Sequence, residues 1–179
     1  MTVILGIDPG SRCAGFGVVN LVGGRPEYLA SGLIRTRQQT LAKRLGEIYL
    51  GTAELVGQYQ PDAVAIEDVF VARDPRAALR LGQARGAAIA AVAAVGICVV
   101  EYSPRTVKQA VVGSGAATKE QVQRMVMQLL RLPAAPPADA ADALAVAICH
   151  AHAGFAPLQL GSRRRRGRAR VIAGLEAGA

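Results

Sequence analysis

Two short apolar runs in this chain each lead directly into a carboxylate, and this pattern constrains the fold more than any other feature. Val3–Ile7 is followed by Asp8, and Ala63–Ile66 is followed by Glu67. Runs of this length and composition are typical of buried strands. A carboxylate at the buried end of a strand is costly unless a cation or a partner compensates its charge. The pattern therefore predicts a sheet whose strand ends share a charged site.

The rest of the chain alternates between strand-like and helix-like stretches, with turn residues between them. Strands are expected over residues 2–8, 15–20, 27–35, 62–67 and 97–101. Helices are expected over residues 41–59, 75–95, a short stretch from 103, 119–130 and 139–153. The order of three strands, helix, strand, helix, strand and helices predicts an α/β fold, in which helices flank a mixed five-stranded sheet.

Length and composition limit the organisation of the chain. With 179 residues, of which 51% are hydrophobic, one substantial core is expected, and the class of disordered proteins is excluded. We expect one domain over residues 1–155, followed by a basic and flexible tail over 156–179. The start of the sequence has no signal-peptide pattern, and no apolar stretch is long enough to span a bilayer, so we expect no membrane contact and a cytoplasmic location.

The positive charge of the chain is concentrated near its end. Of the net charge of +8, five charges come from the six arginines and one glutamate that follow residue 160. The arginines are Arg163, Arg164, Arg165, Arg166, Arg168 and Arg170. Such a run is typical either of an arm that binds a polyanion or of a solvated end. We favour contact with nucleic acid.

A second acidic pattern lies at the start of the last helical stretch. Asp139 and Asp142 are spaced i, i+3, which places both on one face of a helix. Taken singly, two of the acidic residues have simpler interpretations. Asp139 is a good helix cap, and Asp8 suits a turn. Caps and turns do not explain Glu67 at a strand end, however. The four carboxylates together predict a divalent-metal site.

Five segments, in this order, resemble the RuvC-type Holliday junction resolvases. They are Leu5–Arg12, Ala65–Phe70, Leu81–Gly86, Val107–Gln109 and Ala138–Leu144. The similarity extends from residue 3 to about residue 153. The combination is far more specific than the first segment, which on its own also resembles actin-like ATPases and other ribonuclease H-like proteins.

The resemblance implies a ribonuclease H-like fold and a homodimer that resolves four-way DNA junctions by paired nicks in homologous recombination and DNA repair. It implies that Asp8, Glu67, Asp139 and Asp142 are catalytic and bind Mg²⁺ or Mn²⁺, with two ions per active site. Two such ions can activate a water and stabilise the leaving oxygen of a phosphodiester. The expected products carry a 5′ phosphate and a 3′ hydroxyl. The RuvA–RuvB branch-migration complex is an implied partner.

The resemblance also implies DNA contacts. Lys108 and Lys119 match lysines near the scissile phosphate, although exposed helix lysines are often inert. Phe70 matches an aromatic residue that inserts toward junction bases, although it would also suit a core. The remaining expected DNA-binding residues are Arg73, Arg85, Arg163, Arg164, Arg165 and Arg166. Where the family often has a lysine and an asparagine, this chain has Arg73 and Asp74, which leaves its cutting preference open.

Other interpretations stay open. Strand alternation turns Asp68 away from Glu67, so we expect Asp68 to be solvated. His150 and His152 are spaced i, i+2, and we expect core or surface histidines rather than metal ligands. The rival functions are a ribonuclease H-like nuclease of other substrates, an actin-like ATPase and a catalytically silent DNA-binding module. Cleavage of a four-way junction compared with an RNA–DNA duplex separates our expectation from the first rival. Metal-dependent nicking separates it from the other two.

Overall fold

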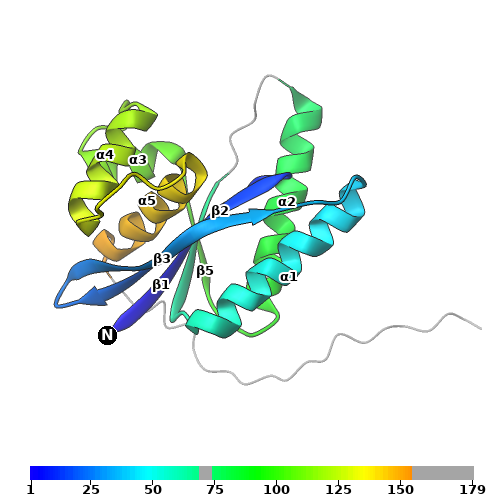
Figure 1. Cartoon of the computed structure of the whole chain (residues 1–179), viewed down its shortest axis with the longest axis horizontal. Coiled ribbons are helices and arrows are strands. Elements are labelled where there is room, and N and C mark those ends of the chain that lie inside the picture. The colour runs from blue at the N-terminus through cyan, green and yellow to red at the C-terminus, as the bar shows by residue number, and fades with distance from the viewer. Residues whose placement is uncertain (69–73, 155–179) are drawn as a thin grey trace, which may run out of the picture.

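In the part of the chain that the structure describes, five strands form one mixed sheet in the order β3-β2-β1-β4-β5 (Figure 1). The computed structural model describes residues 1–68 and 74–154. The strands are β1 (Thr2–Asp8), β2 (Cys13–Val22), β3 (Arg25–Arg35), β4 (Ala63–Glu67) and β5 (Val99–Tyr102). The predicted mixed five-stranded sheet is therefore confirmed. β2 begins two residues earlier than expected, because Cys13 and Ala14 pair with Arg35 and Ile34 of β3.

The direction of each strand determines which strand ends lie together. β1, β2 and β3 pair antiparallel, whereas β4 pairs parallel with both β1 and β5. In the β1–β4 ladder, Ile7 is opposite Ile66. The next residues, Asp8 and Glu67, therefore follow the same rung of two adjacent parallel strands.

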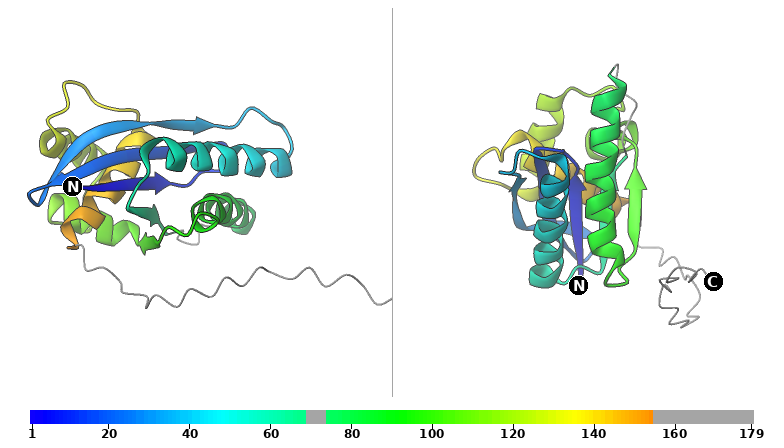
Figure 2. Two further views of the ribbon diagram at one scale, coloured as in Figure 1. Left: turned by 90° about the horizontal axis from the view of Figure 1, so that it is seen from below. Right: turned by 90° about the vertical axis from the view of Figure 1, so that its right-hand side faces the viewer.

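Within residues 1–68 and 74–154, five helices cover the two faces of the sheet. They are α1 (Leu41–Tyr59), α2 (Pro75–Ala93), α3 (Pro104–Val112), α4 (Lys119–Leu130) and α5 (Ala138–His152). One apolar cluster joins α1 and α2 to one face, and a second cluster joins α3, α4 and α5 to the other face. Figures 1 and 2 show these two helical layers on either side of the sheet.

Side-chain caps position several of these helices. The Asp74 carboxylate accepts a hydrogen bond from the Arg76 backbone N–H at the start of α2, and the Ser103 hydroxyl accepts one from the Thr106 N–H at the start of α3. Thr118 and Gln121 form a capping box at the start of α4. The N-cap of α5 is Pro137, so Asp139 lies inside the first helical turn and does not cap the helix.

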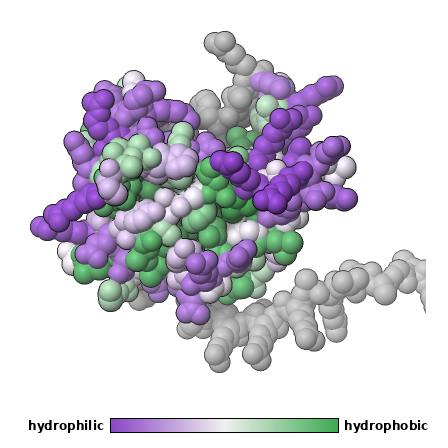
Figure 3. Space-filling view, viewed as in Figure 1, coloured by the Kyte–Doolittle hydropathy of each residue, from purple (hydrophilic) through white to green (hydrophobic). Residues whose placement is uncertain are grey.

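The surface seen in Figure 3 has hydrophilic residues along much of its rim and apolar residues near its centre. The helices in the described ranges 1–68 and 74–154 include none that is long and apolar enough to cross a membrane. Cys13, Cys98 and Cys149 are free cysteines. The predicted domain boundary near residue 155 falls where the described residues stop, so it stays a prediction.

Candidate active site

The site begins with two strand ends. Asp8 is the last residue of β1, and Glu67 is the last residue of β4. Strand alternation puts the side chain of Glu67 on the same face as Ala65, which belongs to the apolar cluster under α5. Both carboxylates therefore lie at one edge of the sheet, next to the helical layer of α3, α4 and α5.

Glycines on β1 and β2 let α5 lie unusually close to the sheet. A Cβ built on Gly15 would lie 1.9 Å from the Asp139 carbonyl oxygen, and one on Gly6 would lie 2.2 Å from the Ala143 oxygen. Gly17 similarly faces the side chain of Leu144. Because Gly15 pairs with Asp8 in the β1–β2 ladder, the first turn of α5 lies directly beside the end of β1.

This packing creates a pocket of about 210 Å³ with charged walls. Its lining residues are Asp8, Glu67, Pro104, Val107, Lys108, Lys119, Val122, Asp142 and Ala145. Three of the four predicted carboxylates thus face one cavity. The fourth, Asp139, hydrogen-bonds the Cys13 thiol and still acts on Asp8 electrostatically.

The carboxylates destabilise each other's charged forms. Burial raises the pKa of Asp8 to about 8, and the negative charges of Glu67, Asp142 and Asp139 contribute to the shift. The pKa of Glu67 is also raised, mainly by burial and then by Asp142, although a hydrogen bond with Asp8 opposes that shift. Ionisation of these groups would place uncompensated negative charges side by side in a largely buried site, and a bound cation would relieve that repulsion.

Two lysines supply positive charge to the same pocket. Lys119 Nζ donates a hydrogen bond of 3.1 Å to Asp142 Oδ2 and forms an ion pair with it. That hydrogen bond and the charge of Asp142 raise the pKa of Lys119. Lys108 lines the pocket from α3. The pocket therefore holds both the oxygen donors that a hard metal ion needs and ammonium groups suited to phosphate oxygens.

Within residues 1–68 and 74–154, no three His, Cys, Asp or Glu side chains are already close enough to form a cage for a metal ion. Magnesium-type sites commonly use one or two carboxylates, and substrate phosphates and waters complete the coordination of the ion. The donor set of the pocket consists of carboxylate oxygens, which match such an ion. The residues present therefore fit the implied metal.

The other predicted residues lie elsewhere. The Arg85 guanidinium makes ion pairs with Asp68 and Glu101 on the α2 side of the sheet, so Asp68 is half-exposed and paired rather than simply solvated. Phe70, Arg73, Arg163, Arg164, Arg165 and Arg166 lie outside the described residues. His150 is buried, and its Nδ1 lies 2.9 Å from the Tyr102 hydroxyl.

Sequence reasoning missed Cys13 as a neighbour of Asp139. The pKa of the Cys13 thiol is raised, mainly by burial and then by the hydrogen bond between the thiol and Asp139. The two residues are far apart in the sequence, and no motif connects them. The close approach of α5 at Gly15 brings them together.

The chain is similar to known proteins of one family. Residues 4–150 match the family model described as crossover junction endodeoxyribonuclease RuvC. A protein of that name from Tolumonas auensis is 60% identical over 152 residues, which cover 85% of this chain and 88% of the relative. One from Hahella chejuensis is 55% identical over 172 residues, covering 95% of this chain and 100% of the relative.

Solved structures agree as well. The RuvC of T. thermophilus in complex with a Holliday junction substrate superposes with a TM-score of 0.80 at 38% identity, covering 86% of this chain and 94% of that one. The yeast mitochondrial Holliday junction resolvase Ydc2 shares the fold, with a TM-score of 0.63 at 11% identity over 83% of this chain and 78% of that one.

The fold and the acidic pocket define a nuclease of the ribonuclease H-like class. Within this class, the chain belongs to the RuvC family of crossover junction endodeoxyribonucleases. It is a structure-specific endonuclease that resolves four-way DNA junctions in recombination and repair, and its activity depends on a divalent metal ion.

Proposed function

We propose that Asp8, Glu67, Asp139 and Asp142 are the catalytic, metal-binding residues of this resolvase. The observation that carries the proposal is the convergence of Asp8, Glu67 and Asp142 on one cavity, where burial and mutual repulsion raise the pKa of Asp8 to about 8. Asp139 borders this group from the first turn of α5. Divalent ions bound here would activate water for in-line attack and stabilise the leaving oxygen of the phosphodiester.

The protein's own residues orient the substrate around that chemistry. Asp8 and Glu67 follow the same rung of two paired strands, so the sheet holds their spacing. Asp142 lies across the pocket on α5. In the proposed reaction this arrangement leaves a 5′ phosphate and a 3′ hydroxyl.

Lys108 and Lys119 are proposed to bind the DNA backbone at the scissile position. Both line the pocket, and the Lys119 ammonium already lies 3.1 Å from an Asp142 carboxylate oxygen. An ammonium beside the reacting phosphate would hold its oxygens and stabilise developing negative charge. Substitution of each lysine tests its role. A lysine that only binds DNA affects junction affinity, whereas a lysine that acts in the chemical step affects the cleavage rate of junction that is fully bound by protein.

Mg²⁺ and Mn²⁺ are the proposed cofactors, with two ions in each active site. Both are hard ions that suit carboxylate oxygens and water. Cleavage of a labelled mobile junction, measured while each ion is titrated in turn, identifies the preferred one.

Single amide substitutions test the site. Each substitution retains the shape of the side chain and removes its charge. The four variants are Asp8→Asn, Glu67→Gln, Asp139→Asn and Asp142→Asn. We expect each to abolish cleavage of the junction and to leave its binding within a few-fold of that of the natural chain. Asp62→Asn, on the loop before β4, is the control that should cut normally. Full activity of Asp8→Asn or Glu67→Gln would overturn the assignment.

A homodimer is proposed to place two such sites on the two-fold symmetric junction. The exposed side of α2 supports this assembly. Leu79 is 69% exposed there, and a Cβ on Gly82 or Gly86 would meet nothing within 4 Å. A second copy of this chain could approach these glycines closely.

The other proposals rest on the sequence and on family membership. Phe70 and Arg73, next to Glu67 in the chain, are proposed to contact DNA near the cleavage point, and the tail arginines are proposed to contact phosphates. Co-purification with the RuvA–RuvB complex on junction DNA would test that partnership. A cytoplasmic location stays a prediction.

A further inference from the structure

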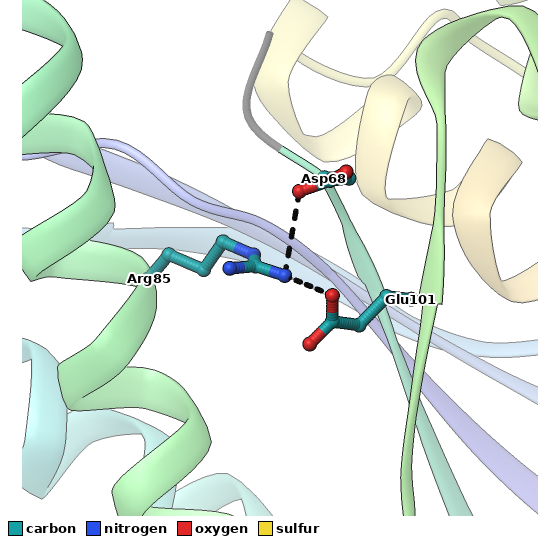
Figure 4. Close-up of polar contacts among 3 residues, drawn as sticks. All are labelled: Asp68, Arg85 and Glu101. Carbon is teal, nitrogen blue, oxygen red and sulfur yellow. Dashed lines mark ion pairs between the residues drawn. The ribbon is translucent and has the colours of Figure 1, made fainter.

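Arg85 bridges two strands on the side of the sheet opposite the pocket. Its Nη2 lies 3.4 Å from Asp68 Oδ1 and forms a second ion pair with Glu101 Oε2 (Figure 4). The Arg85 side chain is 18% exposed, whereas those of Asp68 and Glu101 are 53% and 51% exposed. We call these three residues the Arg85 cluster. It joins α2 to the segment after β4 and to β5.

The Arg85 cluster holds the strand end that carries Glu67. Asp68 directly follows Glu67, and its backbone N–H donates a hydrogen bond of 2.8 Å to the Tyr102 carbonyl oxygen. Ile66 pairs with Glu101 in the β4–β5 ladder, and Glu67 pairs with Tyr102. Because side chains alternate along a strand, Asp68 and Glu101 face α2 while Glu67 and Tyr102 face α5.

The opposite face of the same strand end is also tied to a helix. The Tyr102 hydroxyl lies 2.9 Å from His150 Nδ1, and the two rings meet edge to face with centroids 5.9 Å apart. α5, which supplies His150, also supplies Asp139 and Asp142. The end of β4 and β5 is therefore held by α2 on one face and by α5 on the other.

This support matters because both strands are short. β4 has five residues and β5 has four, and Glu67 is the final residue of its strand. Strand ends open locally more easily than strand centres. A catalytic carboxylate, however, must stay within about 0.5 Å of its working position.

We infer that Arg85 is a positioning residue for cleavage, which acts by holding Asp68 and Glu101 together and thereby fixing the carboxylate of Glu67. The inference rests on the proposed catalytic role of Glu67. Both contacts are made by one guanidinium nitrogen, Nη2, which has two N–H donors and so can serve both carboxylates. The contacts of the guanidinium with two acids on the α2 face favour this role over the direct DNA contact that the sequence suggested.

The test compares the cleavage rate with junction affinity. Arg85→Met should lower the single-turnover cleavage rate of saturated junction about tenfold, with the junction Kd unchanged within twofold. It should also raise the Mn²⁺ concentration needed for half-maximal rate. Arg85→Lys should restore part of the rate. Arg80→Met, which removes an exposed arginine from the same helix, is the matched control and should cut at the natural rate.

A double substitution shows whether Arg85 acts through its two acids. Asp68→Asn combined with Glu101→Gln should reproduce the loss of rate, and adding Arg85→Met to that pair should cause no further loss. A direct DNA contact predicts the opposite, namely that Arg85→Met alone weakens junction binding and flattens the salt dependence of log Kd by about 0.9. That result, or full activity of Arg85→Met, would overturn the inference.

Two further measurements keep the outcomes separate. Thermal melting shows whether Arg85→Met folds. If it does not fold, Arg85→Lys and the double variant Asp68→Asn, Glu101→Gln provide the test. Glu67→Gln is assayed in parallel. If Glu67→Gln cuts normally, the proposed site is wrong; if it is inactive while Arg85→Met is fully active, only the positioning role is wrong.

Discussion

At the scale of single residues, Asp8 shows how a cluster of buried carboxylates, here the proposed catalytic site, reduces the stability of the metal-free protein. Its carboxyl is buried beside three other acids, and the resulting pKa of about 8 lies far above the ordinary value of 3.8. Between these two values the folded chain holds a proton that the unfolded chain has released. The free energy of unfolding therefore falls as pH rises through this window, and the loss is complete above pH 8.

This fall in the free energy of unfolding with rising pH gives a prediction for the metal-free protein. In EDTA, Asp8→Asn should melt several degrees higher than the natural chain at pH 8.5, because a chain of this size gains about 2–4 °C per kcal/mol. The difference should shrink toward pH 5, and added Mg²⁺ should raise the melting temperature of the natural chain but not that of the variant. Glu54→Gln, which neutralises an exposed acid on α1, is the control. A lower melting temperature for Asp8→Asn at pH 8.5 would contradict this account.

At the scale of elements, the distance between α5 and the β1–β2 ladder determines whether the site exists. Gly6, Gly15 and Gly17 leave no room for side chains, because residues of α5 fill the space. Asp139 and Asp142 reach the end of β1 because of this close approach. The packing of a helix on a sheet is thus as much a part of the site as the carboxylates are.

Gly15→Ala should separate these elements. The added Cβ would lie 1.9 Å from the Asp139 carbonyl oxygen, so α5 must shift. We expect the free energy of unfolding to fall by about 1–3 kcal/mol, which is typical of overpacking, and cleavage to decrease strongly. Chemical denaturation and junction cleavage measure the two effects.

Gly46→Ala is the matched control for this prediction. Gly46 is an exposed glycine inside α1, and a Cβ there meets nothing within 4 Å. It should leave cleavage unchanged and stabilise the chain by about 0.5–1 kcal/mol, since alanine is the better helix former. Equal behaviour of the two variants would show that the close approach at Gly15 has no importance.

At the scale of the whole molecule, the proposed two-fold assembly would account for paired nicks. If the exposed side of α2 is the dimer interface, Gly82→Glu should convert the dimer to a monomer by adding bulk and a buried charge where two backbones meet. Sedimentation equilibrium at micromolar concentration measures this. Gly57→Glu, at an exposed helix glycine of α1 that is equally open, should stay dimeric. A natural chain that is monomeric and active would exclude the assembly.

The arginine tail belongs to the same scale, because binding to phosphates increases affinity without selecting a site. Deleting residues 162–179 should weaken binding of junction and linear duplex alike. It should also flatten the slope of log affinity against log salt by about 0.9 for each phosphate that the shortened chain no longer binds. Deleting residues 171–179 removes no arginine and should preserve the slope. Identical slopes for all three chains would show that the tail is a solvated end.

Local sequence determined most of the elements of this protein. Three local features predicted these elements, and each depends only on neighbours in the chain. They are the apolar runs before Asp8 and Glu67, the proline and capping residues at the starts of α2, α3 and α4, and the spacing of Asp139 and Asp142. Hydrophobic periodicity and capping are short-range effects, so they can be recognised without a structure. The resemblance of five segments then indicated the family that the comparisons confirm.

The tertiary structure alone decided which side chains act on one another. Each of these contacts joins residues that lie 16 or more positions apart in the sequence. Arg85 pairs with Asp68 and Glu101, Lys119 pairs with Asp142, and Cys13 contacts Asp139. Their burial and the pKa of Asp8 follow from the same packing. Electrostatic coupling depends on distance and on the exclusion of water in space, and a linear sequence contains neither quantity until the chain has folded.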